Sequence, residues 1–293
     1  MTYEELEKKR KKFRNRLISC VIGFMIFLSV IFYYAETLGA YCVILTLIAL
    51  PITALFIAKP IEEYSKAYKE YFVLRSLKKY FSELKYDPDS GMPKDIIAAT
   101  KMIYMGNMYD SDDFISGKYK DVSFKQADVH IQYDDHDSEK SSIITLFKGR
   151  WMVFDFNKEF KSNIQVVQKE FGFNKLLEDD GISYKKVEME SDSFNKRYNV
   201  FAKNEHEAFY ILTPSLMEKL EKLDDTNEGK LLLCFVDNKL HIGLYDDNDS
   251  FEPPSCMHKI NEEKEMNKTN KDIKVITQFI DELNLDNTLF KKD

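Results

Sequence analysis

The segment from residue 17 to residue 58 contains one charged side chain, Glu36, in a chain whose composition is 31% charged. Glu36 divides the segment into two apolar runs, Leu17–Tyr34 and Leu38–Ala58. A hydrocarbon core of about 30 Å requires roughly 20 apolar residues in a helix, so each run is long enough to span a bilayer. The sequence therefore predicts a transmembrane helical hairpin.

Three other interpretations of the apolar segment fit less well. A cleaved signal peptide has an apolar core of about 7–15 residues and a small-residue cleavage site before a polar mature start, and the segment matches neither feature. A lipoprotein signal needs a small residue directly before Cys42, where Tyr41 stands. A buried helical hairpin of a soluble protein stays open as an alternative.

Basic residues flank the apolar segment on both sides and are absent from the loop between the two runs. The flanking cations are Lys8, Lys9, Arg10, Lys11, Lys12, Arg14 and Arg16 before the segment, and Lys59, Lys66, Lys69, Arg75, Lys78, Lys79 and Lys85 after it. Because basic flanks stay on the cytoplasmic side, we expect a multi-pass membrane protein with both termini in the cytoplasm. The N-terminal cations also suit contact with anionic headgroups of the lipid bilayer.

The net charge of −7 is unevenly distributed along the chain. It divides into +4 over residues 1–16, −1 over residues 17–58 and −10 over residues 59–293. A body this acidic, without a basic stripe carrying interleaved aromatic residues, argues against nucleic-acid binding. The four cysteines show no spacing typical of a disulfide framework, as expected in a reducing compartment.

After the apolar segment the pattern is first helical and then β-like. Apolar residues between Pro60 and Lys85 recur at steps of three and four, which predicts an amphipathic helix. Short branched and aromatic runs broken by turn residues then predict strands over Val122–Phe124, Val129–Tyr133, Ile143–Phe147, Trp151–Phe156, Ile164–Val167, Ser183–Met189, Arg197–Phe201, Lys230–Val236 and Leu240–Tyr245. Further helices are expected after Pro93, from Asn204 to Leu212, from the N-cap Thr213 onward and over Ile273–Leu283.

This order of elements predicts the α+β class rather than an alternating α/β fold. The predicted organisation is a basic cytoplasmic tail (1–16), a transmembrane hairpin (17–58, with spans 17–34 and 38–58), an amphipathic stalk helix (59–86) and a mixed, mainly antiparallel α+β cytoplasmic domain (87–293).

No known catalytic motif is present in the sequence. With ten glycines in all, neither a phosphate-binding loop nor a dinucleotide-binding fingerprint can be placed, and no nucleophile elbow, His-Glu-x-x-His or Cys-x-x-Cys pattern occurs. Cys256 and His258 lie close in sequence, but two ligands do not make a zinc site. We therefore assign no catalytic, cofactor-binding or metal-binding residue from the sequence, and no cofactor.

Three acidic clusters could supply oxygen ligands to Ca²⁺ or Mg²⁺: Asp110–Asp113, Asp134–Asp137 and Asp246–Asp249. None has the glycine turn and distal glutamate of an EF-hand loop. Because Asp and Asn are also the residues that solvated turns prefer, the sequence favours turns over metal sites. Trp151 and the phenylalanines near it have strand spacing and are expected in the core.

Five motifs occur in order along the chain: Tyr109–Gly117, Phe147–Gly149, Phe154–Phe160, Tyr198–Phe201 and Ala208–Met217. Together with the paired N-terminal apolar runs, they resemble a bacterial family known as domain of unknown function 3137. The resemblance covers residues 60–254 and departs from the family at Ser162–Asn163, where a glycine is expected. The resemblance implies bacterial origin and thus the inner membrane, and it transfers no activity or catalytic residue. Family members look like genomic neighbours of LemA-type membrane proteins, which hints at a shared envelope role and makes a LemA-type protein one candidate partner.

The function we expect is that of a protein-interaction module held at the inner membrane, with a membrane or membrane-associated protein as its partner. The rival hypothesis is an enzyme with an unrecognised site, metal-assisted through the loops Asp110–Asp113 and Asp134–Asp137. A third is an accessory subunit of a membrane transport or envelope complex. The sequence does not determine the oligomeric state.

Overall fold

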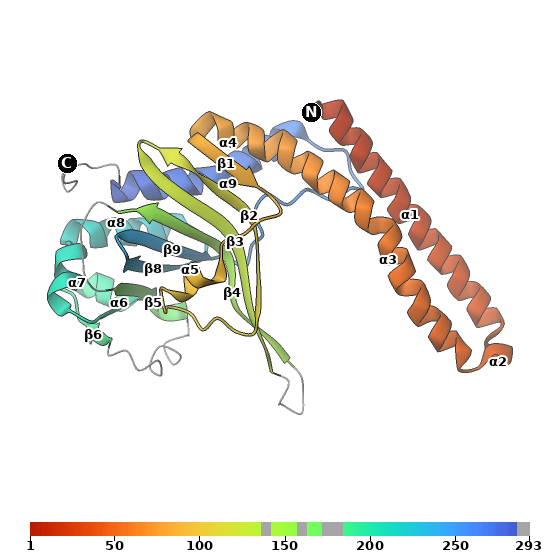
Figure 1. Cartoon of the computed structure of the whole chain (residues 1–293), viewed down its shortest axis with the longest axis horizontal. Coiled ribbons are helices and arrows are strands. Elements are labelled where there is room, and N and C mark those ends of the chain that lie inside the picture. The colour runs from red at the N-terminus through yellow and green to blue at the C-terminus, as the bar shows by residue number, and fades with distance from the viewer. Residues whose placement is uncertain (136–141, 157–162, 172–183, 286–293) are drawn as a thin grey trace. The chain divides into compact units, whose positions relative to one another are not determined.

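The computed structural model describes residues 1–135, 142–156, 163–171 and 184–285 (Figure 1). The chain divides into two compact units. The first unit comprises Met1–Ser76 and Phe251–Asn270, and the second comprises Leu77–Ser250 and the chain from Lys271 onward. This division differs from the predicted one, because residues 251–270 group with the N-terminal helices and not with the α+β domain.

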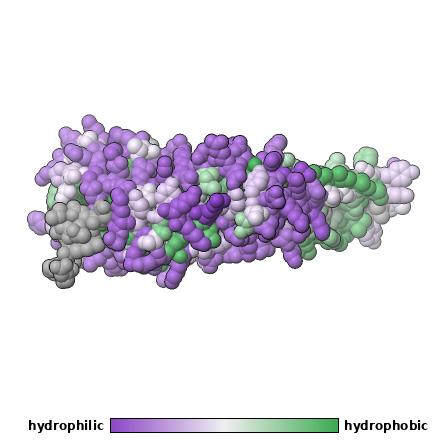
Figure 2. All heavy atoms as spheres, turned by 90° about the horizontal axis from the view of Figure 1, so that it is seen from above, coloured by the Kyte–Doolittle hydropathy of each residue, from purple (hydrophilic) through white to green (hydrophobic). Residues whose placement is uncertain are grey.

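In the first unit, α1 (Tyr3–Tyr33) and α3 (Tyr41–Tyr68) form an antiparallel hairpin, joined by the short helix α2 (Ala35–Leu38) (Figure 1). Both helices are long and apolar enough to cross a membrane, and their apolar stretches are not buried. Figure 2 shows hydrophobic residues gathered over this hairpin. The predicted pair of apolar helices is confirmed.

The basic segment 1–16 is helical, because α1 begins at Tyr3. Its N-terminus has a capping box: the Thr2 hydroxyl accepts from the Glu5 N–H at 3.2 Å, and the Glu5 carboxylate accepts from the Thr2 N–H at 2.8 Å. These bonds satisfy backbone donors that a free helix end leaves unpaired. The basic residues of this segment therefore lie on the same continuous helix as the first apolar run.

The charged end of the hairpin, residues 3–16 and 60–71, is named here the hairpin base. The segment Phe251–Asn270 is bonded to it through side chains of α1 and α3. The bonds are Tyr3 Oη to Ile260 O (2.7 Å), Arg10 Nη1 to Cys256 O (2.5 Å), Tyr64 Oη to Pro254 O (3.0 Å) and Tyr68 Oη to Glu265 Oε2 (2.9 Å). Glu7 and Arg10, which form an ion pair of 2.8 Å, are buried in this base.

The helix predicted over Pro60–Lys85, and hence the stalk over residues 59–86, is too long. After α3 the chain continues through a π-helical segment, η1 (Lys69–Leu74), and α4 (Arg75–Tyr80), and then enters strand β1 (Ser82–Asp87). Phe81 lies between the end of α4 and the start of β1, and its ring packs against that of Phe124, with centroids 4.6 Å apart. Tertiary pairing of β1 with a neighbouring strand outweighs the local helical periodicity.

The second unit is built on one nine-stranded sheet with the order β1-β2-β3-β4-β9-β8-β5-β7-β6. Every strand pairing among the described residues is antiparallel, which confirms the α+β class. The remaining strands are β2 (Met108–Tyr119), β3 (Val122–Asp135), β4 (Ser142–Asp155), β5 (Ile164–Gln168), β6 (Lys185–Val187), β7 (Tyr198–Ala202), β8 (Lys230–Val236) and β9 (Lys239–Tyr245).

Two predicted breaks between strands are wrong. The runs before and after residue 125 form the single strand β3, and Lys148–Arg150, predicted as a turn, lies inside the single strand β4. Gly149 has φ of 149° and pairs with Tyr245 of β9. The glycine at position 149 allows the backbone of the neighbouring strand to approach closely. From the sequence alone, a glycine with this role cannot be distinguished from a glycine in a turn.

The hairpin predicted from the turn around Asp237 is confirmed. Strands β8 and β9 are joined by Asp237 and Asn238, whose φ angles are 50° and 55°. Positive φ at both central residues is the geometry of a type I′ turn, whose twist matches that of the two flanking strands. Asp and Asn tolerate these φ values. This turn lies at one rim of the groove described below.

Helices cover parts of the sheet: α5 (Lys94–Ala98), α6 (Asp192–Arg197), α7 (Glu205–Ile211), α8 (Pro214–Thr226) and, from Lys271 onward, α9 (Glu262–Leu283). The predicted N-caps are confirmed, since Asn204 accepts from His206 N–H at 3.0 Å and Thr213 from Leu216 N–H at 3.4 Å. Trp151 is fully buried in the core, as predicted. It packs with residues of the sheet and of the chain around α5.

Candidate functional site

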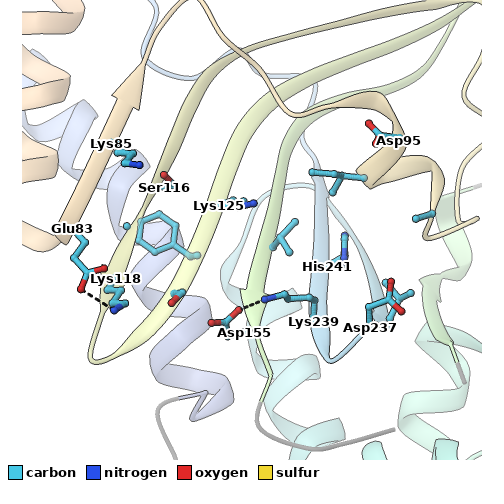
Figure 3. A pocket seen from close by; sticks show the side chains of 17 residues that line it. Glu83, Lys85, Asp95, Ser116, Lys118, Lys125, Asp155, Asp237, Lys239 and His241 are labelled. Carbon is cyan, nitrogen blue, oxygen red and sulfur yellow. Dashed lines mark hydrogen bonds and ion pairs between the residues drawn. The ribbon is translucent and has the colours of Figure 1, made fainter. Parts of the chain in front are cut away.

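A groove of about 750 Å³ opens on one face of the sheet in the second unit (Figure 3). Strands β1, β2, β3, β4 and β9 supply most of its lining, and Val236 of β8, Asp95 and Ile96 of α5, and Ala99 directly after α5 add to it. The volume lies within the roughly 300–1,000 Å³ typical of ligand sites in proteins.

The groove exists because one face of the sheet changes character along its strands. On β3, Ala127, Val129 and Ile131 belong to the apolar core, whereas Ser123 and Lys125, which alternate with the same period, line the groove. Successive side chains of a strand point to opposite faces, so all five residues share one face. The uncovered part of that face is polar, and it becomes the candidate site.

The groove is lined by four lysines and by the four carboxylates of Glu83, Asp95, Asp155 and Asp237. Two ion pairs are made within it, Lys118 with Glu83 at 2.8 Å and Lys239 with Asp155 at 2.5 Å (Figure 3). Lys85 on β1 and Lys125 on β3 are exposed and form no ion pair with any residue that the structure describes. Their ammonium groups are therefore the cations that a bound anionic group can meet.

His241 of β9 also lines the groove and is 5% exposed. The Trp151 indole N–H donates to His241 Nδ1 at 3.4 Å, which places the proton of the neutral ring on Nε2. Burial, and to a lesser extent Lys239, lowers the pKa of His241 to about 4. The ring is therefore uncharged at neutral pH.

Acidification should destabilise the second unit through His241. Its pKa of about 4 when folded lies below the value of 6.5 for an ordinary histidine, so the unfolded chain binds the proton more strongly between these values. Stability is therefore lost as the pH falls through this window, by about 2 kcal/mol at pH 5 relative to pH 7. Thermal unfolding of the full chain in detergent, followed by fluorescence of Trp151, should show this loss in the wild type and not in His241→Gln.

The control for this experiment is His206→Gln, the same substitution at an exposed histidine of α7. It should keep the pH dependence of the wild type. Equal pH dependence in His241→Gln and His206→Gln would contradict the assignment of the effect to His241.

The structure brings two of the three acidic clusters together. Asp110–Asp113 lies in β2 and Asp246–Asp249 follows β9, and residues of both line a small cavity of about 80 Å³. The interpretation as a solvated turn is therefore wrong for the first cluster, in which Asp113 is fully buried. The remaining cluster is Asp134–Asp137. Its Asp134 and Asp135 end β3, and His136 and Asp137 lie outside the described residues.

Sequence reasoning missed Asp128, which lines the same small cavity from β3. It is 4% exposed, and its position directly opposite Asp112 depends on the β2–β3 register. Burial raises the pKa of Asp128 well above its usual value, while Arg150 acts in the opposite direction. Cys256 and His258 lie in the first unit, and the Cys256 carbonyl accepts from Arg10 there.

Comparison with known proteins finds a family model that matches part of the chain. The sequence model of a family described as protein of unknown function (DUF3137) matches residues 145–285. This match confirms the resemblance to the DUF3137 family over residues 145–285. The match begins inside β4 and includes β5 to β9, whereas the resemblance noted from the sequence covers residues 60–254. The chain thus combines a domain of unknown function with two apolar N-terminal helices.

A search of curated proteins gives no match to this chain. Among solved structures, the crystal structure of the mycobacterial trehalose monomycolate transport factor A, TtfA, is similar, with 8% sequence identity over 75% of this chain and 94% of that chain. The TM-score is 0.37, so this similarity supports no conclusion about fold or function.

Proposed function

We propose that this chain is a membrane-anchored binding protein, whose groove takes up an extended acidic segment of another membrane or membrane-associated protein. The observation that carries the proposal is the pair Lys85 and Lys125, which lie in an open groove whose other lysines are already paired. An extended segment along the strands, with carboxylates near Lys85 and Lys125, would supply counter-ions to the two groove lysines that form no ion pair with a described residue.

The apolar hairpin supports the same function. Two membrane-spanning helices would tether the chain that carries the groove to the bilayer, which raises its effective concentration toward partners in the same membrane. The basic residues on both flanks of the hairpin and their absence from its loop favour both termini in the cytoplasm of a bacterial cell. The partner segment is then cytoplasmic.

Site-specific crosslinking in living bacteria tests this proposal. A photoreactive amino acid placed at position 125 of the full chain should give crosslinks to a cytoplasmic segment of a membrane-associated protein, identified by mass spectrometry. The matched control is position 196, an exposed lysine on α6 away from the groove lining. Crosslinks only to segments outside the cytoplasm would contradict the orientation.

Charge reversal sharpens the test. The double variant Lys85→Glu/Lys125→Glu should reduce the crosslinked product and weaken binding of the identified partner about tenfold or more, equivalent to about 1.4 kcal/mol. Lys196→Glu should leave both unchanged. Equal crosslinking from positions 125 and 196, or unchanged binding in the double variant, would remove the basis of the proposal.

A further inference from the structure

The groove of the second unit holds unpaired charges of both signs. Two of its four lysines are paired with two of its four carboxylates. The lysines left over are Lys85 and Lys125, and the carboxylates left over are Asp95 of α5 and Asp237 of the β8–β9 turn. All four residues are exposed, and none forms an ion pair with any residue that the structure describes. A purely anionic partner would therefore be attracted by two charges and repelled by two.

The unpaired lysines and the unpaired carboxylates lie on opposite sides of the groove. Lys85 of β1 pairs with Ser116 of β2, and Ser116 pairs with Lys125 of β3, so these side chains form one row on the same face of the sheet. On the other side, β4 and β9 separate β3 from β8, the strand that ends directly before Asp237. Neighbouring strands are about 4.8 Å apart, which places β3 and β8 about 14 Å from each other. Figure 3 shows Asp95 on the side of Asp237 and away from Lys85.

An extended segment that lies along the strands faces both sides of the groove at once. Successive side chains of an extended chain point in opposite directions, so residues an odd number of positions apart point to opposite sides. Acidic side chains can then meet Lys85 and Lys125, while a lysine or arginine of the same segment points toward Asp95 and Asp237. A segment with acidic residues alone would leave both carboxylates facing negative charge, and like charges placed together weaken binding.

We propose that the segment bound in the groove carries charges of both signs, with acidic residues toward Lys85 and Lys125 and at least one basic residue toward Asp95 or Asp237. This inference rests on the function proposed for the groove and specifies the chemistry of its partner. The basic residue stands an odd number of positions from an acidic one, because this spacing places the two side chains on opposite sides of the segment. Charges of both signs on each partner also fix the register of the bound segment.

Crosslinking followed by peptide binding tests this inference. A photoreactive amino acid in place of Ser123, an uncharged residue of the groove lining, keeps both unpaired lysines and captures the bound segment in living bacteria. The captured segment is then synthesised as a peptide and titrated calorimetrically into the full chain in detergent. The double variant Asp95→Asn/Asp237→Asn should bind this peptide about threefold or more weakly, because exposed ion pairs are lost. A purely acidic segment would instead bind the double variant more tightly, since the substitutions remove repulsion.

The matched control is Glu218→Gln, at an exposed carboxylate of α8 outside the groove lining, and it should leave the affinity unchanged. Asparagine tolerates the φ of 50° at position 237, so the double variant keeps the β8–β9 turn. A second peptide, in which glutamine replaces the basic residue, adds a double-mutant cycle. It should bind the wild type about threefold more weakly than the first peptide, and the double variant should not weaken its binding further.

The possible results separate this inference from the function on which it rests. Tighter or unchanged binding of the captured peptide to Asp95→Asn/Asp237→Asn, or a captured segment without a basic residue, would overturn the inference. The proposed function would still stand in that case if Lys85→Glu/Lys125→Glu weakened binding. If this lysine variant bound the peptide as the wild type does, or if position 123 captured no segment, the inference and the proposed function would both be wrong.

Discussion

Replacing Arg10 with methionine should lower the stability of the hairpin base by about 3–5 kcal/mol, the range expected when one partner of a buried ion pair is removed. Arg10 is 2% exposed and Glu7 is 7% exposed, and their charged groups lie 2.8 Å apart. The variant leaves the Glu7 carboxylate buried without its counter-ion. It also removes the donor to the Cys256 carbonyl.

The pH dependence of this loss identifies its cause. Burial acts to raise the pKa of Glu7, but hydrogen bonds from Arg10 and from the Ile260 N–H hold that pKa below its usual value. Without Arg10 the carboxyl group should take up a proton at higher pH. The difference in stability between Arg10→Met and the wild type should therefore shrink as the pH is lowered.

Hydrogen exchange of the amides in residues 251–270, measured on the full chain in detergent, reports this local stability. The control is Lys12→Met, because Lys12 pairs with Glu63 at 2.6 Å but is 50% exposed, and exposed pairs contribute less than about 1 kcal/mol. The double variant Glu7→Met/Arg10→Met should recover part of the loss. Equal exchange in Arg10→Met and Lys12→Met would refute the structural role assigned to the buried pair.

Replacing Gly149 with alanine should destabilise the second unit by about 3 kcal/mol or more. A Cβ at this position would lie 2.1 Å from the Leu244 carbonyl oxygen, and this obstacle is backbone, so no side-chain rotation can remove it. The φ of 149° adds strain for any residue with a side chain. Overpacking and backbone strain each cost about 1–3 kcal/mol, and both act here.

The matched control is Gly117→Ala in the same sheet, where the nearest atom would lie 3.1 Å from the new Cβ, the Ser82 carbonyl oxygen. This variant should lose clearly less stability than Gly149→Ala in thermal unfolding followed by Trp151 fluorescence. If Gly149→Ala unfolded within about 1 kcal/mol of the wild type, the close pairing of β4 with β9 at this point would be wrong.

The parts of the fold that sequence reasoning predicted are those with local causes. The apolar hairpin follows from run length, the β8–β9 hairpin from the Asp237–Asn238 turn, and the start of α8 from Thr213 followed by Pro214. The errors arise where partners distant in sequence decide the outcome. Residues 82–85 continue a helical pattern but pair with β2, and Gly149 resembles a turn residue but lies between β3 and β9.

The groove and the small cavity show the same limit more strongly. Lys85 and Lys125 belong to one groove because β1, β2 and β3 are neighbours, and neither lysine is unusual in the sequence. The acidic clusters were visible, but Asp128 pairs with Asp112 only through a register interrupted by a bulge. A single sequence does not reveal that register, because the shift depends on how the β2–β3 pair is held by the rest of the sheet.

The composition of the first unit has a consequence for the order of events during biosynthesis. Its two parts, Met1–Ser76 and Phe251–Asn270, are separated by the whole of Leu77–Ser250. Chains are made from the N-terminus, so the apolar helices leave the ribosome long before the segment that bonds to the hairpin base exists. A chain that stops before residue 251 would keep both apolar helices but leave Glu7 and Arg10 without the backbone partners at Ile260 and Cys256. The bonds between the hairpin base and residues 251–270 therefore form only on chains that have been translated through the sheet.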